Sequence, residues 1–410
     1  MYKLVILAVM TFNLGYDLVM RVLAVRQKKL PLPDNVRDIY DEKEYTRWRE
    51  YSAEKSRAGL VSTLADFVLG LILFGTNVLS AVYHVLPGGD YLKSILLMLV
   101  YAAFLTLWSI PYEYYVTMKI EGKYGFNKTS GKTFVTDTVS NFVINFIVNA
   151  ALMCFAMFMF ERMGAAFFAV LYAVIALFML AVNMLSMTFM RIFNKFTPLP
   201  DGSLRDTLVA MFREAGDELS DIRVMDASRR TTKVNAFCTG LGKFKKIALY
   251  DNLVENYTDE EIAAVFAHEL AHFKHRDTAK MTAYNMLTMA VLTAMIAAFA
   301  LIPQISFDYG FTDVNFAFAI AALTGVLLSP VMTVLQIPSA FFGRRYEYRA
   351  DRMAAELGYG EAMVTVLKKL ARDNFSDLNP HPVIVALEHN HPTVSARIEA
   401  IRKVEIKHDF

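Results

Sequence analysis

The chain has 410 residues, of which 55% are hydrophobic, and its mean hydropathy is +0.34. This is more apolar surface than one soluble core can bury, so the composition excludes an ordinary soluble domain and predicts a membrane protein. The net charge of +2 gives no basis for a nucleic-acid partner, and two cysteines, Cys154 and Cys238, are too few for a disulfide framework.

Seven apolar stretches are each long enough to cross the hydrocarbon core of a bilayer as a helix. They cover approximately residues 4–23, 60–82, 92–110, 134–160, 165–190, 286–305 and 314–337. The first stretch lacks a sizeable basic segment before it and a clear small-residue cleavage site after it. We therefore interpret it as a retained span rather than a signal peptide.

Loop charges predict how these spans are oriented. Lys and Arg gather in the segment 26–57 and in the loop after the third span, which carries Lys119, Lys123, Lys128 and Lys132. The short connections 84–90, 161–164 and 306–313 together contain one Lys or Arg, Arg162. Because positively charged loops stay on the cytoplasmic side, we expect the N-terminus outside and the C-terminus in the cytoplasm.

The fourth span carries a polar stripe. Polar residues recur there every four positions, namely Thr133, Asp137, Asn141, Asn145 and Asn149. This spacing places them on one face of a helix. Hydrogen bonding between helices is one interpretation, and a water-containing interior is the other. We favour the water-containing interior because further polar residues lie in other spans.

The region 191–280 turns polar and predicts a small soluble domain. We expect an amphipathic helix over 204–219 and short strands at 222–226, 234–239 and 246–250. A strand beside a catalytic site can accept an extended peptide as an added strand, and 234–239 is the candidate. Alternatively, this strand serves only as part of the domain core and binds no peptide.

The stretch from Thr258 to Asp277, TDEEIAAVFAHELAHFKHRD, predicts a helix that begins with a capping box of Thr258 and Glu261. On this helix His268 and His272 lie four residues apart on one face, which suits two ligands of one zinc ion. Glu269 beside them is the expected general base, since it can take a proton from a water that attacks a peptide bond.

A second helical pattern follows the last span, from Arg344 to Leu357. Here Glu347 is the candidate third zinc ligand, and Asp351, one turn later, can accept a hydrogen bond from the far nitrogen of a zinc-bound histidine. A charged, solvated helix face is the alternative interpretation.

Eight sequence blocks occur in a characteristic order: EKSRAGLV (54–61), PYEYYVTMKIEGKYGFNKTSGKTF (111–134), FNKFTPLPDG (193–202), VNAF (234–237), HELAH (268–272), EYRAD (347–351), NFSDLNPHP (374–382) and HPTVSARI (391–398). Their order and spacing together resemble a known family, the type I CAAX prenyl endopeptidases. The resemblance implies an all-α integral membrane protein whose seven transmembrane helices form a barrel around a water-filled chamber. It also implies a gluzincin-like α+β zinc protease domain on the cytoplasmic side.

The resemblance also implies roles for particular residues. Glu347 completes a site for one Zn²⁺ per chain, and Asn235, followed by Ala236 and Phe237, lies on the substrate-binding edge strand. His391 and Arg397 resemble tail residues that reach back to the active site, where such donors can hold the carbonyl oxygen as it becomes an oxyanion. A helix-capping histidine and a surface arginine are the alternatives.

Two features depart from the family pattern. Ala271 stands where members often have Gly, which concerns helix packing more than metal chemistry. The connection 306–313 is short for a eukaryotic member and suggests a bacterial or archaeal chain. The expected location is the cytoplasmic (inner) membrane for a prokaryotic chain and the endoplasmic reticulum membrane for a eukaryotic one.

The expected domains are a membrane region (1–191), a first protease part (192–283), a transmembrane hairpin (284–337) and a second protease part with the tail (338–410). The expected function is zinc-dependent cleavage, within an intramembrane chamber, of prenylated C-terminal CAAX peptides or related membrane-associated peptides. A general quality-control metalloprotease of the membrane and a seven-span transporter or receptor are the alternatives. The expected partners are a peptide, with or without a prenyl group, and membrane lipid.

Overall fold

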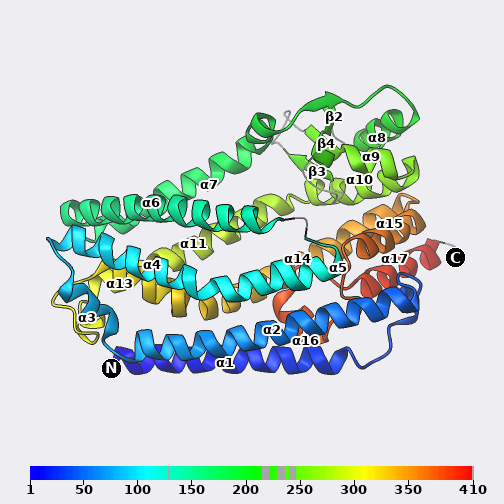
Figure 1. The fold of residues 1–410 in the computed structure, drawn as a ribbon. Helices are drawn as coiled ribbons and strands as arrows, with labels where there is room; N and C mark the ends of the chain where they lie inside the picture. Colours follow the sequence, from blue (N-terminus) through cyan, green and yellow to red (C-terminus); the bar gives the residue numbers. More distant parts are fainter. Residues whose placement is uncertain (128, 215–220, 230–235, 240–245, 409–410) are drawn as a thin grey trace. The chain divides into compact units, whose positions relative to one another are not determined.

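The structure is a computed structural model that describes residues 1–127, 129–214, 221–229, 236–239 and 246–408 (Figure 1). The chain forms two compact units. Unit 1 comprises Met1–Val22, Thr46–Val174 and Met289–Val334, and unit 2 comprises Leu23–Tyr45, Ile175–Thr288 and Leu335–Phe410.

Seven long helices of the described residues are apolar enough to cross a membrane, which confirms the expected number of spans. The span-forming helices are α1 (Tyr2–Gln27), α2 (Glu42–Gly75), α4 (Asp90–Tyr114), α6 (Gly131–Met163), α7 (Ala166–Phe193), α11 (Asp277–Leu301) and α14 (Leu328–Glu356). A π-helical segment, η2 (Tyr115–Glu121), extends α4, and another, η5 (Leu323–Leu327), precedes α14. Short helices α13 (Phe316–Ala322) and α5 (Gly122–Tyr124) complete these two spans.

The second span ends earlier than its apolar pattern predicts. Helix α2 stops at Gly75, and a separate helix, α3 (Val78–Val85), follows. The Thr76 hydroxyl accepts a hydrogen bond from the Val78 amide at 3.2 Å and so competes with continuation of the helix. The expected boundary at residue 82 was therefore wrong, because hydropathy does not register a local polar turn.

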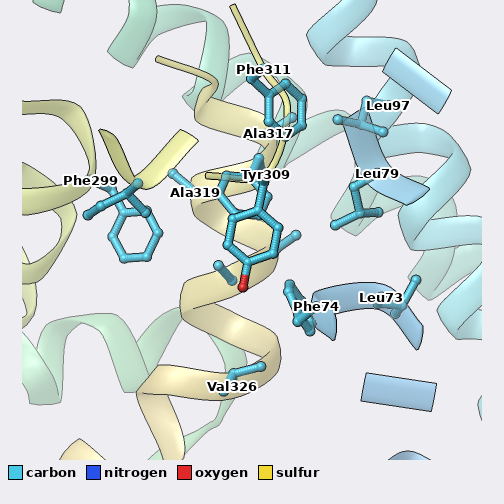
Figure 2. Packing of buried hydrophobic residues seen from close by; sticks show 14 of the residues in the cluster. Leu73, Phe74, Leu79, Leu97, Phe299, Tyr309, Phe311, Ala317, Ala319 and Val326 are labelled. Atoms are coloured by element: carbon cyan, nitrogen blue, oxygen red, sulfur yellow. The ribbon is translucent and has the colours of Figure 1, made fainter. Parts of the chain in front are cut away.

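The core of unit 1 is built around aromatic side chains of the segment before α13 (Figure 2). The rings of Tyr309 and Phe318 lie 4.5 Å apart between centroids, and those of Phe311 and Phe318 lie 5.1 Å apart. Gly310, between the two loop aromatics, has a φ of +86°, which favours glycine. The Asn315 side chain caps α13 by accepting a hydrogen bond from the Phe318 amide. This cap fixes where α13 begins, and the ring contacts fix how the preceding loop packs against it.

The polar stripe of α6 is exposed in unit 1 at Asn141, Asn145 and Asn149. The amides of Asn145 and Asn149 each donate to the carbonyl oxygen four residues earlier, at 2.7 Å. The water-containing interior that this stripe suggests remains a prediction.

Unit 2 contains a four-stranded sheet in the order β1-β2-β4-β3. The strands are β1 (Phe196–Pro198), β2 (Asp221–Met225), β3 (Ala236–Thr239) and β4 (Lys246–Tyr250). Strand β2 is parallel to β4, whereas β1 and β3 pair antiparallel with β2 and β4. Among the described residues β3 is therefore an edge strand, in the part of the chain expected to supply one.

Helices α8 (Ser203–Glu214), α9 (Asp251–Asn256) and α10 (Asp259–Lys274) lie next to this sheet (Figure 1). Their apolar side chains form one buried cluster that includes Phe212, Leu253, Phe266 and Leu270. The predicted amphipathic helix over 204–219 corresponds to α8, and residues 215–220 lie outside the described part of the chain.

A second cluster of unit 2 joins the segment after α1 to the C-terminal helices. Val36 and Tyr40 are buried together with Leu367 of α15 (Gly360–Asp373) and Ile398 of α17 (Val394–His408). Residues 23–45 thus pack with the C-terminal helices of unit 2, whereas the expected domains assign them to the membrane region. The expected domain boundaries remain a prediction.

Candidate metal centre

The centre is built on α10, which begins with the predicted capping box. The Thr258 hydroxyl accepts from the Glu261 amide at 3.3 Å, and the Glu261 carboxylate accepts from the Thr258 amide at 3.0 Å. Lys369 of α15 also pairs with Glu261 at 2.6 Å. These contacts fix the start of the helix and therefore the rotation at which its histidines face inward.

Helix α10 ends at Lys274, whereas the sequence predicts one helix through Asp277. Arg276 has a φ of 56°, in the left-handed region, and this residue turns the chain between α10 and α11. Asp277 consequently becomes the first residue of α11. The prediction of a single helix over 258–277 was therefore wrong at its C-terminal end.

Three side chains converge at the C-terminal half of α10. The Nε2 atoms of His268 and His272 lie 3.2 Å apart. Glu347 of α14 places Oε2 3.6 Å from the first and Oε1 3.4 Å from the second. Two ligands of a tetrahedral ion with bonds of 2.0–2.1 Å are separated by about 3.3 Å. With one ligand atom from each residue, the three atoms lie within 4.8 Å of one another, so these side chains are close enough to share one ion. The donor set of two imidazoles and one carboxylate therefore fits a bound metal. Glu347 lies close to the histidines although the transmembrane hairpin 284–337 stands between them in the sequence.

Each imidazole is anchored through its far nitrogen. His268 Nδ1 lies 3.0 Å from Asp351 Oδ1, and His272 Nδ1 lies 3.1 Å from Asp277 Oδ2. Because a carboxylate only accepts, both Nδ1 atoms donate, and each Nε2 keeps its lone pair for a metal. The two Nε2 atoms lie 3.2 Å apart, a contact that a cation shared by two neutral imidazoles stabilises.

Asp351 lies where the sequence places it, one turn after Glu347, whereas sequence reasoning did not single out Asp277. The available signal was an acidic residue five positions after the second histidine. Its use depends on the turn at Arg276, which the helical pattern does not indicate.

Glu269 lies next to the metal ligands on α10. Burial raises the pKa of its carboxyl group, while the charges of His268 and His272 act in the opposite direction. A carboxylate with a raised pKa is a stronger proton acceptor than a solvated one. Its position and environment therefore suit the general base expected from the sequence.

The C-terminal segment contributes His391 and Arg397. His391 Nδ1 lies 3.0 Å from Glu347 Oε2, and the His391 side chain is 59% exposed. Arg397 is buried, which excludes the surface-arginine interpretation. Its Nε and Nη2 donate to Asp351 at 2.8 and 2.6 Å, and its Nη1 lies 3.1 Å from Glu347. The oxyanion and substrate roles of these two residues remain predictions.

Helix α14 also positions the segment that carries His391. Arg344 donates to the carbonyl oxygens of Val385 and His389 at 2.7 and 2.6 Å, at the end of α16 (Pro382–Glu388). At Gly343 an added Cβ would lie 2.7 Å from the Asn390 carbonyl oxygen. The absence of a side chain at Gly343 therefore permits the backbone before His391 to approach the helix.

The predicted substrate strand is described only in part. Asn235 lies outside the described residues, whereas Ala236 and Phe237 begin β3, which lies beside α10. Ala236 is paired with Leu249 and Phe237 with Ala248 of β4. The backbone of β3 thus runs along the sheet edge next to the helix that carries the histidines.

Two family models match successive parts of the chain. Residues 21–195 match the model described as CAAX prenyl protease N-terminal, five membrane helices, and residues 198–405 match Peptidase family M48. The second match contains every residue of the metal centre. A receptor or transporter in which the histidines are incidental therefore has no support.

Curated relatives match along nearly their whole length. The chain is 26% identical to CAAX prenyl protease 1 of Saccharomyces cerevisiae, over 92% of this chain and 89% of the relative. It is 29% identical to Probable CAAX prenyl protease 1 of Schizosaccharomyces pombe, over 94% and 86%. The crystal structure of S. mikatae Ste24p has the same fold, with a TM-score of 0.79, 24% identity, and coverage of 98% of this chain and 99% of that one.

Seven membrane-spanning helices, a metal-binding triangle and a neighbouring carboxylate thus occur in a chain that both models cover in order. The chain belongs to peptidase family M48 and is a multi-pass membrane metalloendopeptidase.

Proposed function

We propose that this protein uses one zinc ion to cleave CAAX-type peptides at the membrane. The observation that carries the proposal is the triangle of His268, His272 and Glu347, whose ligand atoms lie within 4.8 Å of one another. The far nitrogen of each imidazole lies within hydrogen-bond distance of a carboxylate. Two histidines and one glutamate are the protein ligands of catalytic zinc in several peptidases, where one position stays open for water or substrate. A bound zinc ion polarises the peptide carbonyl and acidifies water.

The remaining steps belong to side chains of this chain. Glu269 takes a proton from the attacking water and passes it to the nitrogen of the leaving amine. Asp351 holds the His268 imidazole in the tautomer that leaves Nε2 free. His391, exposed beside Glu347, donates toward the carbonyl oxygen as negative charge develops there.

The edge strand supports an extended substrate. Among the described residues β3 is the last strand of the sheet, and a peptide that pairs with its outer edge aligns its backbone by main-chain hydrogen bonds. In the proposal Asn235, Ala236 and Phe237 form that edge. The position of β3 beside α10 brings such a peptide near Glu269. The names of the curated relatives support a CAAX peptide as the substrate. We place the cut before its last three residues, as the family resemblance implies.

The setting of the reaction is part of the proposal. The seven spans surround a water-filled chamber, and the protease domain faces the cytoplasm. The polar stripe on α6 supports the chamber, and the excess of Lys and Arg in 26–57 supports the orientation. The membrane is the inner membrane if the chain is prokaryotic and that of the endoplasmic reticulum if it is eukaryotic.

The test is incubation of the purified full chain with matched prenylated and unprenylated CAAX peptides, with products identified by mass spectrometry. We expect loss of the last three residues and faster cleavage of the prenylated peptide. Equal cleavage of both peptides would remove the lipid requirement, and scattered cuts in unrelated membrane proteins would favour a quality-control protease. No cleavage of either peptide would contradict the CAAX proposal.

A further inference from the structure

The two zinc-facing histidines are each the start of a chain of three side chains. His268 bonds to Asp351, and Asp351 is held by Arg397. His272 bonds to Asp277, and Asp277 is held by Arg349 of α14. The second series of contacts involves two residues without a role predicted from the sequence. These are Asp277, the first residue of α11, and Arg349, the third residue of EYRAD.

Both carboxylate oxygens of Asp277 are engaged. Oδ2 accepts from His272 Nδ1 at 3.1 Å, while Oδ1 accepts from Arg349 Nη2 and lies 3.7 Å from Lys280 Nζ. The Asp277 side chain is only 5% exposed, so it has little access to solvent. A buried carboxylate with two fixed partners has a fixed orientation, and it transmits that orientation to the imidazole.

Arg349 is itself held in place. Its guanidinium carbon lies 5.1 Å from the centre of the Tyr346 ring on the same helix, a cation–π contact. Arg349 follows Glu347, the third ligand, by two residues on α14. The Arg349–Asp277 contact therefore ties the helix that supplies the carboxylate ligand to the turn that follows the histidine helix.

We propose that Asp277 is a positioning residue for the metal centre and that Arg349 orients it. By accepting from Nδ1, Asp277 fixes the His272 ring and directs the Nε2 lone pair at the point shared with His268 and Glu347. The carboxylate also makes the imidazole a stronger electron donor. This inference rests on the proposed zinc site, and it extends the site by a second buried Asp–Arg pair.

Asp277 is also the first residue of α11, where an acidic side chain favours the helix. That role alone predicts an effect on thermal stability and none on metal affinity. It also gives no function to the hydrogen bond with His272. Metal affinity and the cobalt(II) spectrum of the site therefore separate positioning from a purely structural contribution.

The experiment measures zinc affinity of the purified full chain by competition with a chromophoric chelator, and records the visible spectrum of the cobalt(II)-loaded form. We expect Asp277→Ala to lower zinc affinity about 10- to 100-fold and to alter the cobalt spectrum. Asp277→Asn keeps an oxygen acceptor for Nδ1 and is expected to restore most of the loss. Arg349→Gln is expected to weaken binding less than Asp277→Ala, since the carboxylate remains.

The matched control is Glu361→Gln, which breaks the exposed pair with Arg402 in the same unit and leaves the metal centre untouched. Wild-type zinc affinity and an unchanged cobalt spectrum in Asp277→Ala would overturn the proposal. If that variant does not fold, the same result in Arg349→Gln would overturn it. Absence of zinc binding in the unmodified protein is a different result, since it removes the proposed function and this inference together.

Discussion

Arg397 compensates the negative charge that gathers around the metal ligands. All three of its side-chain nitrogens face carboxylates, two on Asp351 and one on Glu347. Burial acts to lower the pKa of Arg397, but the carboxylates of Asp351, Glu347 and Glu269 together raise it above its usual value. The guanidinium therefore stays charged, and its geometry supports a role in holding Asp351 and, through it, His268.

Replacement of Arg397 tests this role. Arg397→Ala leaves Asp351 buried without its cation, and breaking a buried ion pair on one side costs about 3–5 kcal/mol of unfolding free energy. We expect a lower midpoint of thermal unfolding together with weaker zinc binding, and Arg397→Lys should recover part of both. Arg402→Ala removes an exposed pair with Glu361 and is the control. Unchanged stability in Arg397→Ala would contradict the compensating role.

At this scale the sequence predicts residues whose spacing is local. His268, Glu269 and His272 follow from helical periodicity, and Asp351 follows from its position one turn after Glu347. Asp277 does not, because its contact depends on a left-handed residue at Arg276. The ion pairs of Arg397 also escape prediction, since they join segments 46 residues apart.

Helix α14 combines two tasks that the sequence suggests separately. It continues from the last span into the segment that carries Glu347 and Asp351 without a break at Pro338. The same helix receives the backbone before His391 at Gly343 and binds the end of α16 through Arg344. The position of one helix thus sets both the third ligand and the approach of the C-terminal segment.

Gly343→Ala tests the close approach at this helix. The new methyl group would lie 2.7 Å from a backbone carbonyl oxygen, so the segment with Asn390 and His391 has to move. We expect peptide cleavage to fall at least tenfold, a loss equivalent to about 1.4 kcal/mol of transition-state stabilisation, while zinc content stays at the wild-type level. Peptide turnover and metal analysis on the same sample measure both.

The control for Gly343→Ala is Gly122→Ala, where an added Cβ meets nothing within 4 Å. Full activity in Gly343→Ala would show that the approach of this segment is not needed for cleavage.

At the scale of elements, the sequence predicts whether a segment is a helix or a strand better than it predicts where the segment ends. Helices α2 and α10 both end before their patterns do, at turns made by single residues.

At the scale of the whole molecule, the number of spans and the family follow from the sequence. Seven apolar stretches correspond to seven long helices, and the ordered blocks correspond to the two family models. The assignment of residues 23–45 to unit 2 does not follow from hydropathy. It depends on Val36 and Tyr40, whose partners in α15 and α17 lie more than 300 residues later.

A water-filled chamber between the spans would make the polar stripe of α6 accessible to water. If water fills the interior, cysteines placed on the polar stripe of α6 react with a water-soluble thiol reagent in intact membranes. We expect reaction at Asn141→Cys, Asn145→Cys and Asn149→Cys in a variant that lacks Cys154 and Cys238. Ile147→Cys on the same helix, facing lipid in this account, should stay unreacted. No reaction at the three stripe positions would rule the water-filled interior out.

The central claim is that a metal held by His268, His272 and Glu347 acts with Glu269 to hydrolyse peptide bonds. The most direct measurement is peptide cleavage by Glu269→Gln, with zinc content determined on the same purified sample. Gln has nearly the same shape as Glu but cannot accept the proton of the attacking water. We predict one zinc per chain and cleavage reduced at least a thousandfold, which corresponds to about 4 kcal/mol. Cleavage near the wild-type rate in the zinc-loaded variant would contradict the account.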